Sequence, residues 1–345
     1  MNTSDVNSAV FPPGKLPFDL LSRLLDGYTG PNKRVLVGPR VGEDATVIEF
    51  ERTCLVVKTD PITFATDEIG HYAVHVNAND IATMGALPRW FLATLLLPEG
   101  RTDAALVEAI FASIHQAAQE IDVSLCGGHT EITVGLDRPI VVGQMLGEVQ
   151  REDLVQSADL QVGDALLMTK GLGVEATAIL AREKQTELAG RGFTPDLLSS
   201  AQNYLHNPGI SILKEARIAC RTARVHAMHD PTEGGVATAL RELAIAADTG
   251  LALEGEALFA SDETRRLCAA FNLDPLGIIS SGALLIGVAA SDAGRVRDAI
   301  RETGTRCEII GRVEDRSFGL KLRKNDVWTD LPTFDRDEIG KIFES

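Results

Sequence analysis

The sequence is poor in sulfur and in aromatic side chains. Its 345 residues include 5 cysteines, 5 methionines and 2 tryptophans, and aromatic residues make up 5% of the chain. The cysteines form no C-x-x-C pair, so we expect no zinc site. Because their number is odd and the chain is large enough to bury a core, we expect reduced thiols and a cytoplasmic location; the cysteines are Cys54, Cys126, Cys220, Cys268 and Cys307.

Long hydrophobic runs and basic residues are also scarce. No window approaches the roughly 18 apolar residues of a membrane span, and the N-terminal MNTSDVNSAVFPPGK lacks the pattern of a signal peptide. Lys and Arg total 33 against 49 Asp and Glu, giving a net charge of −16. Such a surface repels a nucleic-acid backbone, so we expect neither a nucleic acid nor a membrane as partner. ATP remains compatible, since it arrives with magnesium.

Three common catalytic motifs are missing. The chain has no G-x-x-x-x-G-K-[ST], no H-R-D and no G-x-S-x-G. It is therefore not predicted to be a P-loop ATPase, a protein kinase of the usual type or an α/β-hydrolase.

The length and the order of elements predict two domains of α/β (α+β type) structure. A chain of 345 residues exceeds what one hydrophobic core usually supports, and we place the domains at 1–155 and 156–345. In the first half, apolar runs at Cys54–Thr59, Trp90–Leu97 and Pro139–Val149 alternate with helical patterns. The second half alternates strands and helices in the same way, so layers of helix on sheet are expected in both.

The stretch HDPTEGG, residues 229–235, predicts a strand, a turn and a helix. Val236, Leu240 and Leu243 follow it at helical spacing, and its two glycines permit a tight turn. Backbone N–H groups at a helix N-terminus attract anions, but carboxylates beside them repel a bare phosphate. A divalent cation between carboxylate and phosphate removes this conflict, so the stretch indicates one wall of a metal–phosphate site.

Four further clusters combine acidic or amide side chains with glycine. They are VGEDATVI with Gly42 and Asp44, KTDPITF with Lys58 and Asp60, HVNANDIATMGALP with Asn77 and Asp80, and CGGHTEIT with Gly127 and Gly128. The aspartates together with Asp230 are suited to Mg²⁺, which prefers oxygen ligands. The glycine pairs are suited to donating backbone N–H groups to phosphate oxygens.

Each cluster also has a structural interpretation. Gly-Glu-Asp is commonly a solvated turn, and Asp60 at a strand end is commonly a cap or turn former. Asp80, within an apolar helix, could belong to a buried hydrogen-bond network, because a buried charge requires partners. His129 and His229 could be polar packing residues.

In this order the clusters resemble the aminoimidazole-ribonucleotide synthetase (AIR synthase, PurM-like) superfamily. NANDIATMGALPRW carries the superfamily resemblance, and HDPTEGG and DPLGIISSGALLIGV are most similar to its branch of hydrogenase expression/formation (HypE) proteins. The resemblance implies a PurM-like two-domain fold whose N-terminal domain forms an intersubunit β-barrel in a homodimer. It also implies ATP and Mg²⁺ in a cleft beneath the C-terminal domain.

By matching motif, the resemblance assigns roles to the residues of these clusters. It implies that the metal is bound by Asp44, Asp60 and Asp80, that the nucleotide is contacted by Gly42, Asp44, Lys58, Asp60, Asn77, Gly127 and Gly128, and that the catalytic residues are Asp80, Asp230 and His229.

The shared chemistry of the superfamily is phosphorylation of an amide or carbonyl oxygen by ATP, followed by departure of that oxygen as phosphate. HypE-like proteins apply this dehydration to a carboxamide on their own C-terminal cysteine. This chain ends DEIGKIFES, and it has Glu131 and Ser281 where many of them have lysine and glutamate. We therefore expect no self-cyanylation at a C-terminal cysteine, an acceptor that is a small molecule or is carried by a protein, and a metallocentre maturation partner.

Two other functions stay open. One is a small-molecule kinase resembling thiamine-monophosphate kinase, although that family reads D-V-S-D-G-L where this chain has DPTEGG. The other is a nucleotide-binding maturation or scaffold protein without turnover. Release of phosphate from ATP distinguishes an enzyme from a scaffold.

Overall fold

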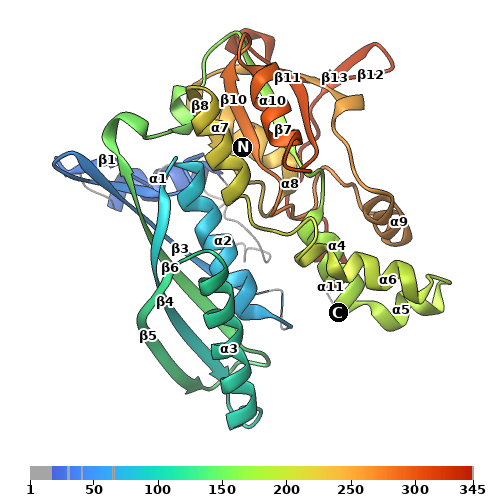
Figure 1. Cartoon of the computed structure of the whole chain (residues 1–345). Coiled ribbons are helices and arrows are strands. Elements are labelled where there is room, and N and C mark those ends of the chain that lie inside the picture. The colour runs from blue at the N-terminus through green and yellow to red at the C-terminus, as the bar shows by residue number, and fades with distance from the viewer. Residues whose placement is uncertain (1–17, 29–31, 40–41, 64, 66, 344–345) are drawn as a thin grey trace, which may run out of the picture.

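The strands lie in two separate sheets, one in each half of the chain (Figure 1). The computed structural model describes residues 18–28, 32–39, 42–63, 65 and 67–343. The N-terminal sheet has the order β1-β2-β3-β6-β4-β5, and all its neighbours are antiparallel except β4 and β5. Its strands are β1 (Val35–Val37), β2 (Thr46–Phe50), β3 (Thr53–Ile62), β4 (Leu87–Pro98), β5 (Ser124–Thr133) and β6 (Ile140–Gln150).

Among the described residues, helices cover one face of this sheet and leave the other open. α1 (Phe18–Tyr28) precedes the sheet, and α2 (Ile69–Thr83) and α3 (Ala104–Glu120) lie against it (Figure 1). α3 begins at Ala104, because the Asp103 side chain accepts a hydrogen bond from the N–H of Leu106 at 2.9 Å. Along β4, Phe91 and Leu95 are buried in the core while Leu92, on the opposite face, stays partly exposed. Within the part of the chain that the structure describes, the sheet is therefore packed on one side only.

The C-terminal sheet has helices on both faces. Its order is β13-β12-β9-β11-β7-β10-β8, and alternate residues of β7 enter different cores. Leu166 packs with residues of α8, and Leu167 packs with residues of α7 and α10. The elements of this half are β7 (Asp164–Thr169), α4 (Val174–Glu183), α5 (Gln185–Gly190), α6 (Pro195–Gln202), η3 (Asn203–Leu205), α7 (Leu213–Thr222), β8 (Val225–His229), α8 (Gly235–Ala247), β9 (Gly250–Glu254), α9 (Asp262–Phe271), β10 (Leu285–Ala289), α10 (Ala293–Arg301), β11 (Cys307–Glu314), β12 (Leu320–Lys324), β13 (Val327–Asp330) and α11 (Gly340–Phe343). The expected helix-on-sheet layers are confirmed in both halves.

The two halves pack closely along α2. One hydrophobic core joins residues of α2 and the N-terminal sheet to residues of α4, α6 and α9. Asn79 of α2 adds two buried hydrogen bonds to the second half: it donates to the carbonyl of Ile210 at 2.8 Å and accepts from the N–H of Ile212 at 3.0 Å. The expected division at 155/156 falls between β6 and β7 and stays a prediction.

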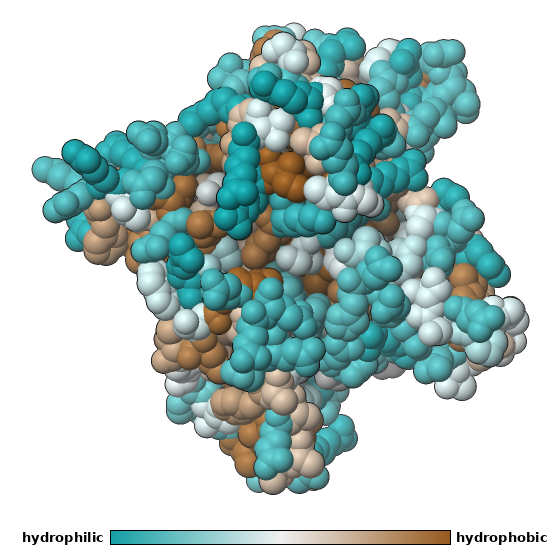
Figure 2. Space-filling view, viewed as in Figure 1, coloured by the Kyte–Doolittle hydropathy of each residue, from teal (hydrophilic) through white to brown (hydrophobic). Residues whose placement is uncertain are grey.

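The surface is mostly hydrophilic. Figure 2 shows apolar side chains gathered between the two halves and at the lower end of the N-terminal part. Exposed apolar residues of that part include Phe111, Ile132 and Val134. Within the described residues, no helix combines the length and the apolarity that crossing a membrane requires.

Candidate active site between the two halves

A tight loop before β2 brings Asp44 against the second half of the chain. Gly42 in this loop has a φ of +85°, and a Cβ built there would lie 2.4 Å from the carbonyl oxygen of Glu242 on α8. Only glycine fits this approach without a shift of backbone. Asp44 follows it, and its side chain is largely buried.

β3 and α2 supply the other polar groups of the first half. On β3, the Nζ atom of Lys58 lies 3.2 Å from Oδ2 of Asp80 and 3.7 Å from Oδ2 of Asp60. Asn77 and Asp80 lie three residues apart on α2 and so share one face of the helix. The Asn77 amide donates to the carbonyls of Ala73 at 2.8 Å and of Asp60 at 3.3 Å, which ties α2 to β3 beside the lysine.

The HDPTEGG stretch has the predicted strand, turn and helix. His229 ends β8, the turn follows, and α8 begins at Gly235. The Nδ1 atom of His229 lies 2.9 Å from Oδ1 of Asp44, and its Nε2 lies 3.0 Å from Oε2 of Glu242. His229 therefore links the loop of the first half to a helix of the second, and Asp230 beside it is fully buried.

The buried charges shift one another's pKa values. Burial raises the pKa of Asp80 well above its usual range, although the Lys58 ammonium opposes this. Burial and then the Asp44 carboxylate raise the pKa of Asp230 to about 7. Burial alone would lower the pKa of Lys58, but Asp80 and its neighbours hold it above its ordinary value. The pKa of His229 is likewise raised against the effect of burial, chiefly by Asp44, which favours an imidazolium.

The cluster carries more acid than base. Two basic groups, the ammonium of Lys58 and the imidazole of His229, are surrounded by five acidic side chains: Asp44, Asp60, Asp80, Asp230 and Glu242. Neither carboxylate oxygen of Asp230 has a hydrogen-bond partner among the described residues, and neither has Oδ2 of Asp44. One ligand atom from each of Asp44, His229 and Asp230 lies within 4.8 Å of the others. Orphaned buried oxygens and excess negative charge fit a hard divalent cation such as Mg²⁺.

The structure brings together eight of the ten predicted site residues and leaves two apart. Gly127 and Gly128 lie on the exposed strand β5. In register, Asp60 pairs with Gly143, which pairs with Ala93, which pairs with Gly128. Three strand spacings put Gly128 about 14 Å from Asp60. Gly128 has a φ of +147°, and a Cβ there would lie 1.9 Å from the Ala93 carbonyl oxygen, so close strand packing explains this glycine.

Two buried glutamates of the site region were missed. Glu242 contacts His229. The sequence does not indicate this contact, because Glu242 is there only a polar residue next to the apolar side of its helix. Glu175 lies in the first turn of α4, where an acid is common simply because it favours the helix dipole. Its burial, near Ser281 and Asp230, could have been found only from the packing.

Comparison with known proteins identifies the relatives of this chain. The model of the N-terminal domain of AIR synthase related proteins matches residues 42–149, and the model of the C-terminal domain matches residues 161–322. A putative hydrogenase expression/formation protein of Methanocaldococcus jannaschii is 32% identical over 75% of this chain and 74% of its own length. Carbamoyl dehydratase HypE of Rhodobacter capsulatus is 30% identical over 90% and 89%, respectively.

The fold agrees with these relatives. The crystal structure of the hydrogenase maturation protein HypE in complex with ATP superposes with a TM-score of 0.70, at 22% identity, over 91% of this chain and 90% of that one. Together with the sequence relatives, this confirms the expected family and fold. The chain belongs to the HypE-like branch of the AIR synthase related proteins.

Proposed function

We propose that the protein is an ATP-dependent enzyme that activates an amide or carbonyl oxygen by phosphorylation, in a dehydration-type reaction. The observation that carries the proposal is the orphaned carboxylate of Asp230, buried beside Asp44 and facing Lys58 between the two halves. The relatives named carbamoyl dehydratase support the same class of reaction, removal of water from an amide-type group.

In this proposal Asp44, Asp60 and Asp80 hold Mg²⁺, which would neutralise charge on the phosphates of ATP. Asp230 lies beside this set, because one of its oxygens is within 4.8 Å of a ligand atom of Asp44. Lys58 lies 3.2 Å from Asp80, so it holds this carboxylate in place. The bonds from Asn77 to the backbone of β3 keep helix and strand in register around it. Catalysis then depends on positioning and charge compensation more than on a nucleophile from the protein.

The proposed reaction has two steps. The amide oxygen attacks the γ-phosphorus of ATP, ADP leaves and one N–H proton is lost; then the C–O bond breaks, phosphate departs with that oxygen, and the second N–H proton is lost to leave a nitrile. A base with a pKa near the working pH is best suited to accept that proton, and the pKa of Asp230 is raised to about 7. His229, held between Asp44 and Glu242, positions the Asp44 carboxylate.

The test is calorimetric titration of ATP with Mg²⁺ and with EDTA, followed by measurement of phosphate release in the presence of primary amides. Wild type should bind ATP only with Mg²⁺. The variants Asp80→Asn and Asp230→Asn should each lose either this Mg²⁺-dependent ATP binding or the release of phosphate. Asp298→Asn, a change at an exposed acid on α10, is the matched control. Failure of wild type to bind ATP at millimolar concentration would refute the proposal. Binding without release under every condition would instead favour a scaffold.

The protein also acts as a homodimer in this proposal. The open face of the N-terminal sheet carries partly exposed Leu92 and Leu146, and the residues of β5 are almost all exposed. β5 is an edge strand, so one row of its backbone groups has no neighbouring strand. A second copy would cover this face, and Gly127 and Gly128 would then be available to a nucleotide held near the interface.

The natural setting is maturation of a metallocentre, with a partner protein that supplies or receives the acceptor group. This extends to the chain what the names of its relatives say of them. Co-purification of the tagged protein with the products of neighbouring genes would identify the partner.

A further inference from the structure

A second cluster of ionisable side chains lies at the start of α2, on another face of the helix from Asn77 and Asp80. His71 and His75 are four residues apart and therefore lie on one side of α2. Asn79 continues the same stripe and bonds to the second half of the chain. This side of α2 thus faces the segment that follows η3, which carries His206.

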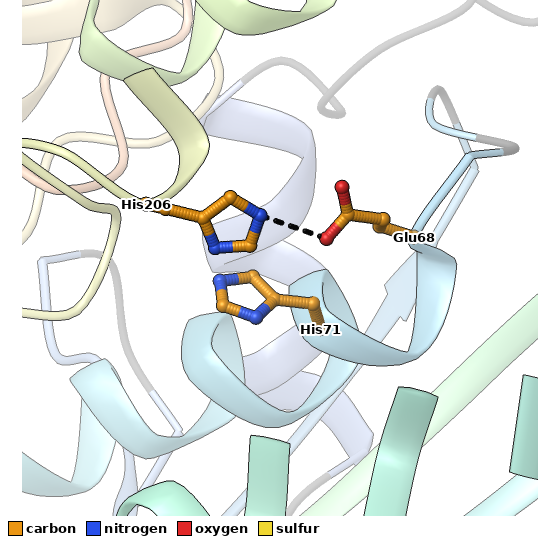
Figure 3. Close-up of side chains that lie close together, drawn as sticks. All are labelled: Glu68, His71 and His206. Carbon is orange, nitrogen blue, oxygen red and sulfur yellow. Dashed lines mark ion pairs between the residues drawn. The ribbon is translucent and has the colours of Figure 1, made fainter. Parts of the chain in front are cut away.

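The side chains of this cluster converge. The ring centroids of His71 and His75 lie 4.2 Å apart, and those of His71 and His206 lie 4.8 Å apart. Nε2 of His75 is 3.7 Å from Oε2 of Glu120 at the end of α3, and Nε2 of His206 is 2.9 Å from Oε2 of Glu68. Figure 3 shows Glu68 and His71 from the start of α2 meeting His206 from the opposite segment.

Two overlapping sets in this cluster have metal-like spacing. His71, His75 and Glu120 each offer a ligand atom within 4.8 Å of the others, and so do Glu68, His71 and His206. Around a tetrahedral zinc ion, ligand atoms lie about 3.4 Å apart, so small side-chain rotations would close either set. Two histidines one helical turn apart are a recurrent way for a helix to present paired nitrogen ligands.

His75 is buried without hydrogen-bond partners for its ring in the described part of the chain. It is 4% exposed, yet neither ring nitrogen has a hydrogen-bond partner among the described residues. Both ring nitrogens of His75 are therefore able to contact a bound ion.

We propose that His71, His75 and Glu120 bind a transition-metal dication such as Zn²⁺, Co²⁺ or Ni²⁺, and that His206, which belongs with His71 to the second set, turns from Glu68 to add a ligand from the opposite half of the chain. Imidazole nitrogens suit these ions, whereas Mg²⁺ prefers an all-oxygen set. The site is distinct from the carboxylate cluster around Lys58. The lack of a C-x-x-C pair predicts no zinc site; the site proposed here does not depend on cysteine, because its nitrogen donors are histidines. A bound ion would join α2, α3 and the segment after η3.

The experiment is a titration of the metal-free full-length protein with Co²⁺, read from its visible absorption, with excess Mg²⁺ present to occupy oxygen sites. Wild type should bind one Co²⁺ with the visible band typical of nitrogen and oxygen ligands. His75→Gln should abolish that band. Glu120→Gln and His206→Gln should weaken Co²⁺ binding at least tenfold; both side chains are about half exposed, so these variants should fold normally.

Two controls separate this site from its surroundings. His115→Gln makes the same kind of change at an exposed histidine of α3 and should leave the band unchanged. Asp230→Asn alters the carboxylate cluster and should also keep the band. The proposal is overturned if Co²⁺ affinity stays within threefold of wild type in both His75→Gln and Glu120→Gln. It is equally overturned if the band disappears in Asp230→Asn alone, which would place the ion in the carboxylate cluster.

Discussion

Glu175 should make the protein less stable in alkaline than in mildly acidic solution. This glutamate is buried in the first turn of α4, and burial raises its pKa to about 7 from an ordinary 4.5, an effect that the nearby Ser281 partly opposes. A folded-state pKa above the unfolded one means that the fold prefers the protonated form. The favourable contribution is complete below about pH 4.5 and is lost as the pH rises through about 7.

The size of the effect follows from the shift. Each pKa unit corresponds to about 1.4 kcal/mol, so ionising Glu175 costs roughly 3 kcal/mol at high pH, and most of this loss falls between pH 5 and pH 8. Glu175→Gln removes the titration while keeping the shape of the side chain. Relative to wild type, the variant should therefore gain about 2–3 kcal/mol of unfolding free energy between pH 5 and pH 8.

The assay is chemical denaturation of wild type and Glu175→Gln at pH 5, 6.5 and 8, in EDTA so that divalent cations do not alter the neighbouring carboxylates. Glu108→Gln, at an exposed position of α3, is the matched control and should show no pH-dependent difference. If the stability difference between Glu175→Gln and wild type is the same at pH 5 and pH 8 within about 0.5 kcal/mol, Glu175 ionises normally and the reasoning is wrong.

Three other substitutions test a close backbone contact, a pair of buried hydrogen bonds and the dimer. Gly42→Ala should lower the unfolding free energy by more than about 1 kcal/mol, because the new Cβ meets the Glu242 carbonyl; an unchanged melting temperature would contradict this. Asn79→Ala should cost on the order of 2–4 kcal/mol, because it leaves two buried backbone groups without partners; denaturation should show it, and a loss below about 1 kcal/mol would argue against the contact. Leu146→Lys should convert the dimer to a folded monomer in light scattering, whereas Phe111→Lys should not; a monomeric wild type would remove the dimer from the proposal.

Local pattern predicted the parts of the fold that depend on neighbouring residues. HDPTEGG gave a strand, a turn and a helix because glycines and helical spacing follow one another within a few residues. The strand β5 could not be predicted in this way. Gly127 and Gly128 are typical of a turn, yet pairing with β4 holds this segment extended. Parallel pairing between distant strands is a tertiary effect that the segment itself does not encode.

The candidate site was predictable only in part. The aspartates and Lys58 stood out because acids and glycines recur at strand ends, and family resemblance connected them. Glu242 and the orphaned oxygens of Asp230 could not be found from sequence, because both depend on what is packed around them. The histidine cluster was missed for a related reason: His206 lies 131 residues after His75, and only the fold brings it beside His71, one turn earlier on α2.

The two hydrogen bonds of Asn79 have a mechanical consequence. Its side-chain amide donates to the carbonyl of Ile210 and accepts from the N–H of Ile212. A peptide group of a neighbouring β-strand would make the same pair of bonds, so here a side chain replaces a backbone contact between the halves. Any rocking of one half on the other that preserves these bonds must pivot here. Asp80 is the next residue, so it lies on the pivot where displacement is smallest. In the proposed function, the outer edges of the halves would move most when a nucleotide enters, and the carboxylates around Lys58 would move least.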